Sequence, residues 1–327
     1  MQALDQHEFS GLIESYRREL QAHCYRMMGS IQDAEDMVQE SFLKAWHRRD
    51  SFEGRASLRA WLYKICTNTC LDALRRRPQR YVPVTHEAVS TLAEPIAPEI
   101  PEPIWLEPYP DHLLYVNHAD VEEQFSRQEN IALAFVVALH VLPPRQRAVL
   151  ILCDVLEWRA REAAVLLGTT AAAVKSALHR ARSTLAARGY VRDAVNTGMP
   201  DEALLRQLDA YVCAWEQADV AALVNLLMED ATFSMPPIPS WYRGKDTIHN
   251  LVSMTVFSGQ ARGRWRLLPT RANHQPAFGV YRQSERSGGH DAYGIQVLTF
   301  QDGLIADIIT FRNPALLKYF NLPLTLA

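Results

Sequence analysis

The chain has 327 residues, of which 48% are hydrophobic, and a formal net charge of -3. It is longer than one typical helical domain and apolar enough to build two or three buried cores. The start, MQALDQHEFSG, lacks the basic and apolar parts of a signal peptide, so we expect a cytoplasmic protein. The longest nearly apolar run, residues 131–142, falls short of the ~20 residues that a membrane span needs, so we expect no span.

Five scattered cysteines show neither a metal-site spacing nor the even number of a disulfide framework, so we expect a reduced environment. We also expect neither a metal nor a cofactor. The charge is distributed unevenly, with a net +2 over residues 1–82, -8 over 83–128, +4 over 129–200 and -1 over 201–327. Two basic modules beside an acidic connector favour nucleic-acid contact by the modules, although solvated basic helix faces would give similar sums.

Apolar residues at helical spacing predict a helical domain over residues 1–82. Gly29 breaks the pattern, and Ser30-Ile31-Gln32-Asp33 resembles a capping sequence that starts a new helix. That helix presents a polar face consisting of Asp33, Glu35, Asp36, Gln39 and Glu40. A further helix follows Ser57 and ends in a run of arginines before Pro78.

Residues 83–127 are rich in proline and in acidic side chains, a composition that favours an extended tether over a packed element. Trp105, Leu106 and Tyr109 are unusually apolar for a free linker, which suggests that this part docks on a surface.

Helical periodicity returns over residues 128–192. A short helix around Ala163, a turn at Gly168 and a second helix with Val174 and Leu185 on one side predict a helix-turn-helix. The outer side of the second helix carries side chains suited to phosphates and base edges: Lys175, Ser176, His179, Arg180 and Arg182. A plain two-helix corner with a solvated basic face stays open as the alternative.

Residues 200–327 change character again and predict a separate α+β domain. An amphipathic helical stretch precedes probable strands at 231–235, 265–269, 277–282, 293–300 and 305–311, and Asp302-Gly303 forms a turn between the last two.

Three stretches, in this order, carry a family resemblance: HCYRMMGSIQDAEDMVQESFLKAW, FEGRASLRAWLYKICTNTCLDALRR and LPPRQRAVLILCDVLEWRAREAAVLLGTTAAAVKSALHRARSTL. They resemble the two conserved domains of sigma-70 family extracytoplasmic-function sigma factors. The resemblance implies a multidomain protein with an all-α sigma-2 domain over residues 1–82 and an all-α helix-turn-helix sigma-4 domain over 128–192. It also implies promoter-specific transcription initiation, with core RNA polymerase and promoter DNA as partners and no enzymatic activity.

The resemblance further implies roles for single residues. The polar face from Asp33 to Glu40 matches the segment that grips the polymerase clamp, and Phe52 and Asn68 match positions that line a pocket for a flipped base. The residues expected to contact the downstream promoter element are Phe52, Arg55, Arg59, Lys64, Asn68, Arg75 and Arg76. Those expected to contact the upstream element are Thr170, Ala172, Lys175, Ser176, His179, Arg180 and Arg182.

The C-terminal part resembles a SnoaL-like domain, a cone-shaped curved sheet closed by helices. MPPIPSWYRG, ANHQPAFGVYR, FNLPLTL and the linker phrase WLEPYPD carry this resemblance. His274 stands where glycine is expected, which puts the local backbone shape in question. We expect residues 200–327 to modulate activity in place of, or beside, an anti-sigma protein, and the candidates for a small-molecule pocket are Trp241, Tyr242, His274 and Tyr293.

Two other functions stay open. An enzymatic SnoaL-like domain would draw on Asp209, His249, His274 and Asp291, yet no pair of these is spaced to fix an acid and a base on one element. A helix-turn-helix transcription factor fused to a small-molecule-binding or enzymatic domain would bind DNA without polymerase. Against it, residues 1–80 look entirely helical and lack the alternating β/α pattern of a response regulator.

Overall fold

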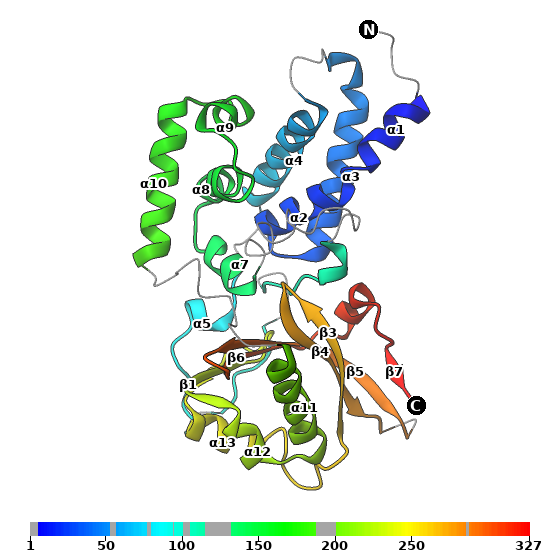
Figure 1. Cartoon of the computed structure of the whole chain (residues 1–327), viewed down its shortest axis with the longest axis vertical. Coiled ribbons are helices and arrows are strands. Elements are labelled where there is room, and N and C mark those ends of the chain that lie inside the picture. The colour runs from blue at the N-terminus through cyan, green and yellow to red at the C-terminus, as the bar shows by residue number, and fades with distance from the viewer. Residues whose placement is uncertain are drawn as a thin grey trace. The chain divides into compact units, whose positions relative to one another are not determined.

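The structure, a computed structural model, describes residues 6–52, 57–76, 80–93, 95–100, 105–114, 132–187, 201–285 and 288–327. The chain forms two compact units. Unit 1 combines Met1–Arg80 with Asp111–Val191, and unit 2 combines Tyr81–Pro110 with Arg192–Ala327. Figure 1 labels the elements, and each unit is described by itself below.

The first part of unit 1 is a helical module. It contains α1 (Gln6–Glu14), α2 (Arg17–Met28), α3 (Ile31–His47), the short 3-10 helix η1 (Arg49–Ser51) and α4 (Leu58–Leu74). Gly29 ends α2 with a left-handed φ of 74° and donates its amide to the oxygen of Tyr25 at 2.7 Å. The hydroxyl of Ser30 accepts the amide of Asp33 at 3.3 Å, so the predicted capping sequence does start α3.

The second part of unit 1 is also helical. It contains η2 (Asp111–Leu113), α7 (Leu133–His140), α8 (Pro144–Leu150), the π-helical turn η3 (Ile151–Val155), α9 (Ala160–Leu167) and α10 (Ala171–Ala187). Gly168 ends α9 with a φ of 62°, and the Thr170 hydroxyl accepts the amide of Ala173 at 3.1 Å to cap α10. Val174, Ala181 and Leu185 are buried along one side of α10. The predicted helix-turn-helix is confirmed.

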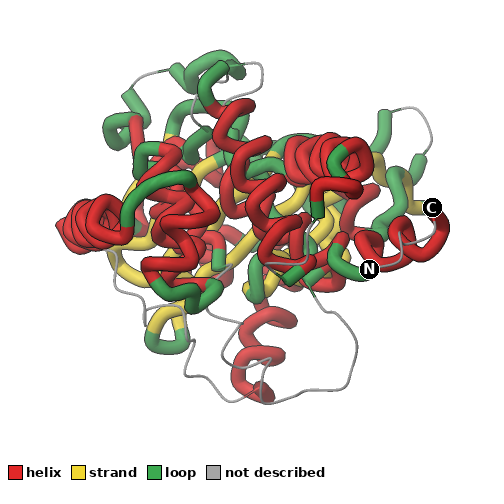
Figure 2. Tube along the Cα trace, turned by 90° about the horizontal axis from the view of Figure 1, so that it is seen from above, coloured by secondary structure: helices red, strands yellow, loops and turns green. Residues whose placement is uncertain are grey.

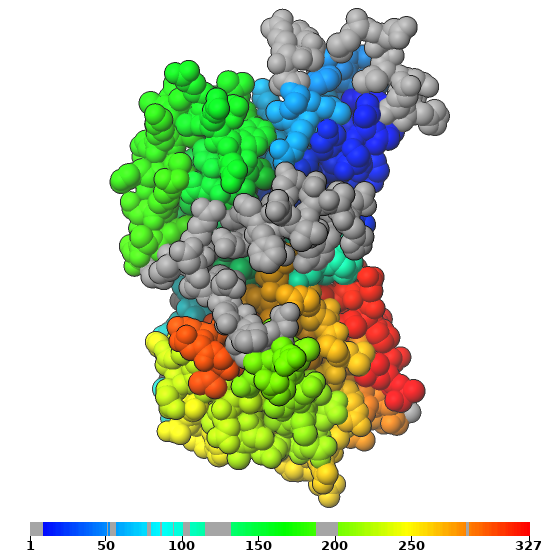
Figure 3. Space-filling view, in the orientation of Figure 1, coloured from blue at the N-terminus to red at the C-terminus, as the bar shows by residue number. Residues whose placement is uncertain are grey.

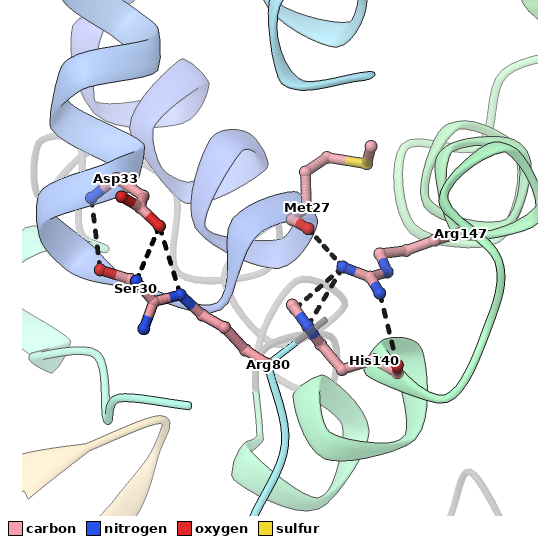
Figure 4. A network of polar contacts seen from close by, with 6 residues as sticks. All are labelled: Met27, Ser30, Asp33, Arg80, His140 and Arg147. Carbon is pink, nitrogen blue, oxygen red and sulfur yellow. Dashed lines mark hydrogen bonds and ion pairs between the residues drawn. The ribbon is translucent and has the colours of Figure 1, made fainter. Parts of the chain in front are cut away.

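The two helical parts pack into one core, because α2 and α4 contact α7, α8 and α9. The ring of Tyr63 on α4 meets that of Trp158, just before α9, edge to face at 5.6 Å. Arg147 on α8 is 1% exposed and bonds to main-chain oxygens at the ends of both α2 and α7 (Figure 4). The sequence patterns of the two parts did not predict this close association.

Unit 2 is an α+β domain, and the strands drawn in yellow in Figure 2 belong to it. Its helices are α5 (Pro83–His86), α11 (Asp201–Gln217), α12 (Val220–Asn225), α13 (Lys245–Met254) and the 3-10 helix η5 (Pro314–Phe320). Its strands are β1 (Leu227–Ser234), β2 (Trp241–Arg243), β3 (Trp265–Ala272), β4 (Gln275–Gln283), β5 (His290–Gln301), β6 (Leu304–Phe311) and β7 (Thr325–Leu326). The five predicted strands are confirmed as β1, β3, β4, β5 and β6, whereas β2 and β7 were not predicted.

The strands form one sheet in the order β2-β1-β6-β5-β4-β3, with β7 added beside β5. Only β1 and β6 pair in parallel among the described strands. One face of the sheet carries the hydrophobic core, to which Phe233, Tyr242 and Ile308 contribute. Because side chains alternate along a strand, Ser234 and its partner Trp241 lie on the opposite face.

The hairpin between β3 and β4 explains the position where glycine was expected. Ala272 pairs with Gln275, so Asn273 and His274 form a two-residue loop, with φ values of 55° and 60°. Such a loop needs positive φ at both positions, which glycine adopts without steric cost. The backbone at His274 therefore has the shape expected of glycine, although histidine adopts this positive φ less readily.

The described residues of the proline-rich connector up to Pro110 belong to unit 2 and are not a free tether, whereas residues 111–114 belong to unit 1. Ser90 donates its amide to the oxygen of Trp241, and Ile100 donates to the oxygen of Pro237, each at 2.9 Å. Leu92 packs against the core of the domain. This docking agrees with the suggestion from the apolar residues near Trp105. Residues 115–127 of the connector lie outside the described part of the chain.

Candidate polymerase and nucleic-acid interfaces

Helix α3 separates the five polar residues that the sequence placed on one face. Asp33 is only 8% exposed, and its carboxylate pairs with the guanidinium of Arg80 at 2.9 Å (Figure 4). Glu35 is half-buried and accepts a long hydrogen bond of 3.4 Å from Gln21. Asp33 thus stabilises unit 1, so the prediction that it lies on the open face is wrong. The capping sequence marked Asp33 as special, but its partner lies 47 residues away.

Asp36, Gln39 and Glu40 remain exposed on α3. Leu43 lies on the same side one turn further along, and it is 62% exposed. Leu43 was not among the predicted residues, although an apolar residue on a polar helix face was the available signal. Single exposed leucines are ordinary on protein surfaces, so Leu43 belongs to this face by position alone.

Around α4 the structure places the predicted downstream-element residues in three kinds of environment. The half-buried ring of Phe52 packs against Trp61 at 5.3 Å, while Lys64 and Asn68 are exposed further along α4. Arg59 is half-buried, pairs with Glu19 at 3.0 Å and lies over the ring of Tyr63.

The remaining members of this set lie at the end of α4 or before its start. Arg75 and Arg76 are exposed, and Arg75 pairs with Asp72 at 3.1 Å. Arg55 lies outside the described residues. Arg59 is therefore engaged inside the module, whereas among the described members of this set Lys64, Arg75 and Arg76 are exposed.

Helix α10 presents the predicted upstream-element residues on its open side. The exposed ones are Thr170, Ala172, Lys175, Ser176, His179, Arg180 and Arg182. The hydroxyl of Thr170 caps the helix, and Arg180 donates to the hydroxyl of Ser176 at 2.7 Å. Arg182 forms a forked pair with Asp154, with its Nε at 3.0 Å and its Nη2 at 2.6 Å from the two carboxylate oxygens. In Figure 3 the surface of this helix is part of the green region.

In unit 2 the four pocket candidates do not converge. Tyr242 lies in the hydrophobic core, whereas the indole N–H of the neighbouring Trp241 donates to the main-chain oxygen of Glu87 in the connector at 2.9 Å. Tyr293 packs edge-on against Trp265 at 5.1 Å, and burial raises the pKa of its phenol. His274 stands in the hairpin loop between β3 and β4. Trp241 and Tyr242 are adjacent in a strand, so their side chains point to opposite faces of the sheet and cannot line one pocket. The prediction that grouped them did not take this alternation into account.

Comparison with known proteins decides the family. Residues 12–80 match Sigma-70 region 2, residues 132–185 match Sigma-70 region 4, and residues 208–308 match the SnoaL-like domain. The chain is 40% identical over 319 residues to the ECF RNA polymerase sigma factor SigG of Mycobacterium tuberculosis, covering 97% of this chain and 84% of the relative. The chain belongs to the extracytoplasmic-function (ECF) RNA polymerase sigma factors.

A solved structure has the same fold as this ECF sigma factor. The crystal structure of the Mycobacterium tuberculosis sigma factor SigJ superposes with a TM-score of 0.61 at 24% identity, covering 97% of this chain and all of the other. In sequence, SigJ is 29% identical over 221 residues, which is 68% of this chain and 62% of SigJ. The predicted fold class, two helical sigma domains followed by a SnoaL-like α+β domain, is confirmed.

The residues of the enzymatic alternative are dispersed on the SnoaL-like domain of the sigma factor. Asp209 lies on α11, His249 on α13 and Asp291 on β5, and all three are exposed. Within the described residues, no cluster of three or more histidine, cysteine or acidic side chains is arranged to hold a metal ion. None of the helices that the structure describes is both long and apolar enough to cross a membrane.

Proposed function

We propose that this ECF sigma factor binds core RNA polymerase in the cytoplasm and directs transcription initiation at specific promoters. The observation that carries the proposal is helix α10, which buries Val174, Ala181 and Leu185 and exposes cationic and hydrogen-bonding side chains on its other side. A helix of this kind fits the major groove, where such side chains reach base edges and phosphates. Region 4 thus reads the upstream promoter element.

Region 2 supplies the other contacts in this proposal. Asp36, Gln39 and Glu40 bind the polymerase together with the exposed Leu43 one turn further along, because protein interfaces combine apolar and polar side chains. Phe52 and Asn68 receive an unstacked base of the downstream element, since an aromatic wall and an amide suit a flipped base. Lys64, Arg75 and Arg76 then follow the phosphates.

The SnoaL-like domain acts in this proposal as a built-in regulator without catalytic activity, in place of or beside an anti-sigma protein. What supports the regulatory role is the connector between regions 2 and 4. The domain binds it at Ser90, Ile100 and Tyr109 through main-chain hydrogen bonds, and through the ion pair of Glu99 with Arg312 at 3.0 Å. A domain that restrains this connector changes how freely the two DNA-reading regions separate. The dispersal of Asp209, His249 and Asp291 supports the absence of catalysis.

The test is run-off transcription with purified bacterial core polymerase on a promoter library. The full chain is compared with a version ending at Arg188, and with a full chain cut at a protease site inserted between residues 188 and 200. Transcripts that depend on the added chain support the sigma role. A promoter activity that differs between the intact, cut and truncated chains supports regulation and gives its sign.

A matched pair of variants separates DNA reading from polymerase binding. Lys175→Ala with Arg180→Ala removes two exposed cations of α10, and we expect lost initiation but normal binding to core polymerase. Ser183→Ala on the same helix, also exposed, is the control. If the chain neither binds core polymerase nor directs initiation, the proposed function fails.

A further inference from the structure

Asn273 makes two opposed hydrogen bonds with a single residue of the connector. Its main-chain amide donates to the oxygen of Tyr109 at 2.9 Å, and its side-chain Oδ1 accepts the amide of Tyr109 at 2.7 Å. Both residues are fully buried, and the neighbouring Pro110 and Ala272 form a β-bridge. One side chain and one main-chain group therefore bind both polar groups of the Tyr109 backbone.

The conformation of Asn273 shows why this residue type suits the position. Its φ of 55° belongs to a tight hairpin loop that glycine would form with less strain. Asparagine tolerates the left-handed region better than most side chains, and unlike glycine it carries an acceptor oxygen. Residue 273 thus combines a turn conformation with a binding group, and a strained conformation of this kind is often kept for a function.

The connector is preformed for this contact. Tyr109 lies between Pro108 and Pro110, and a residue that precedes proline is restricted to extended conformations. Little conformational entropy is therefore lost when Asn273 binds it. Pro110 is followed directly by Asp111, where the chain returns to unit 1.

We propose that Asn273 is the residue by which the SnoaL-like domain fastens the end of the connector, and that the partner this hairpin loop recognises is the extended Pro108-Tyr109-Pro110 segment of the same chain. This inference rests on the proposed regulatory role and names the contact that performs it. The rest of the connector is bound separately, since Trp241 bonds to Glu87 and Ser90, and Arg312 pairs with Glu99. Loss of the Asn273 hydrogen bonds frees the Pro108-Tyr109-Pro110 segment alone.

Two glycine variants of the full chain test the proposal. Asn273→Gly relieves the backbone strain but removes the acceptor oxygen. His274→Gly relieves the same kind of strain at the next residue and keeps the acceptor oxygen of Asn273. Hydrogen exchange is followed in peptides that cover residues 105–114, and run-off transcription is measured on the same proteins. We expect protection of the Tyr109 amide to fall about tenfold in Asn273→Gly only, with promoter activity changing in that variant alone. Asn273→Asp, which keeps an acceptor oxygen, should restore protection.

Two results would overturn the inference, and they differ in what they say of the regulator. If the Tyr109 amide is equally protected in Asn273→Gly and in His274→Gly, Asn273 does not fasten the connector. The regulatory role of the domain is then decided by the transcription experiment with the protease-cut chain. If protection falls in Asn273→Gly and transcription does not change, this contact has no regulatory effect. If the promoter activity of the protease-cut chain also equals that of the intact chain, the domain has no regulatory role.

Discussion

The guanidinium of Arg147 on α8 donates a hydrogen bond to the main-chain oxygen of Met27 in the last turn of α2 (Figure 4). The same group donates to the oxygens of Leu139 and Leu142, at 3.0 Å and 3.3 Å, near the end of α7. Main-chain oxygens at helix ends have no partner within the helix and carry partial negative charge. One buried cation thus satisfies two helix ends, one from region 2 and one from region 4.

Arg147→Met should destabilise the protein by about 3 kcal/mol, because the substitution keeps much of the volume but leaves buried carbonyl oxygens without donors. Arg145→Met on the same helix removes an exposed arginine and should change the free energy of unfolding by less than about 0.5 kcal/mol. Urea unfolding followed by circular dichroism measures both. Equal effects of the two variants would show that the hydrogen bond to Met27 contributes nothing.

Unit 1 should lose stability as the pH falls below 6.5, because it contains buried neutral histidines. Burial, helped by the charge of Arg26, lowers the pKa of His23 to about 3, and burial together with Arg147 lowers the pKa of His140. A folded pKa below the unfolded value gives stability that is complete above the unfolded pKa and is lost as the pH falls toward the folded one.

For His23 alone, the loss between pH 7 and pH 5 should be about 2 kcal/mol. Urea unfolding at the two pH values measures it, and His23→Gln should reduce the pH dependence. His47→Gln, an exposed histidine of the same unit, is the control. A pH dependence that is the same in His23→Gln and in the parent chain would rule out this source.

Asp33 and Asp36 should separate stability from polymerase binding, although they stand on the same turn of α3. Asp33→Ala removes the carboxylate that pairs with the buried guanidinium of Arg80 and should cost about 3 kcal/mol of unfolding free energy. Asp36→Ala removes an exposed carboxylate and should weaken core polymerase binding with unfolding unchanged. Binding measured by fluorescence anisotropy, beside urea unfolding, distinguishes them. If Asp36→Ala unfolds more easily and binds normally, the role assigned to this face is wrong.

Phosphate binding by α10 should appear in the salt dependence of promoter binding. Removing the charge of Lys175 or of Arg180 should reduce the slope of log affinity against log salt by about 1 for each phosphate that the side chain neutralises. The measurement is anisotropy of a labelled promoter with the polymerase complex at several salt concentrations. Ser183→Ala should leave the slope unchanged, and a slope that also stays unchanged in Lys175→Ala would exclude phosphate binding by that side chain.

Elements with a local pattern were predictable from the sequence. The buried stripe of Val174, Ala181 and Leu185 follows helical spacing, and Gly29 and Gly168 mark helix ends. The strands predicted at residues 277–282 and 293–300 match β4 and β5 closely in their bounds. Each of these signals depends on residues a few positions apart, so it is present before the chain folds. The order of the motifs was enough to indicate the family.

The sequence by itself therefore determined most helices and strands, the family and the exposed face of α10, whereas α5 and α13 were not predicted. Only the tertiary structure decided that Asp33 is buried against Arg80, that Trp241 donates to Glu87 in the connector, and that Asn273 binds Tyr109 across 164 positions of the chain. These pairings join residues far apart in sequence, and no local periodicity encodes which distant polar group will meet another. They form because a buried polar group without a partner costs free energy, so the folded chain brings a partner to it.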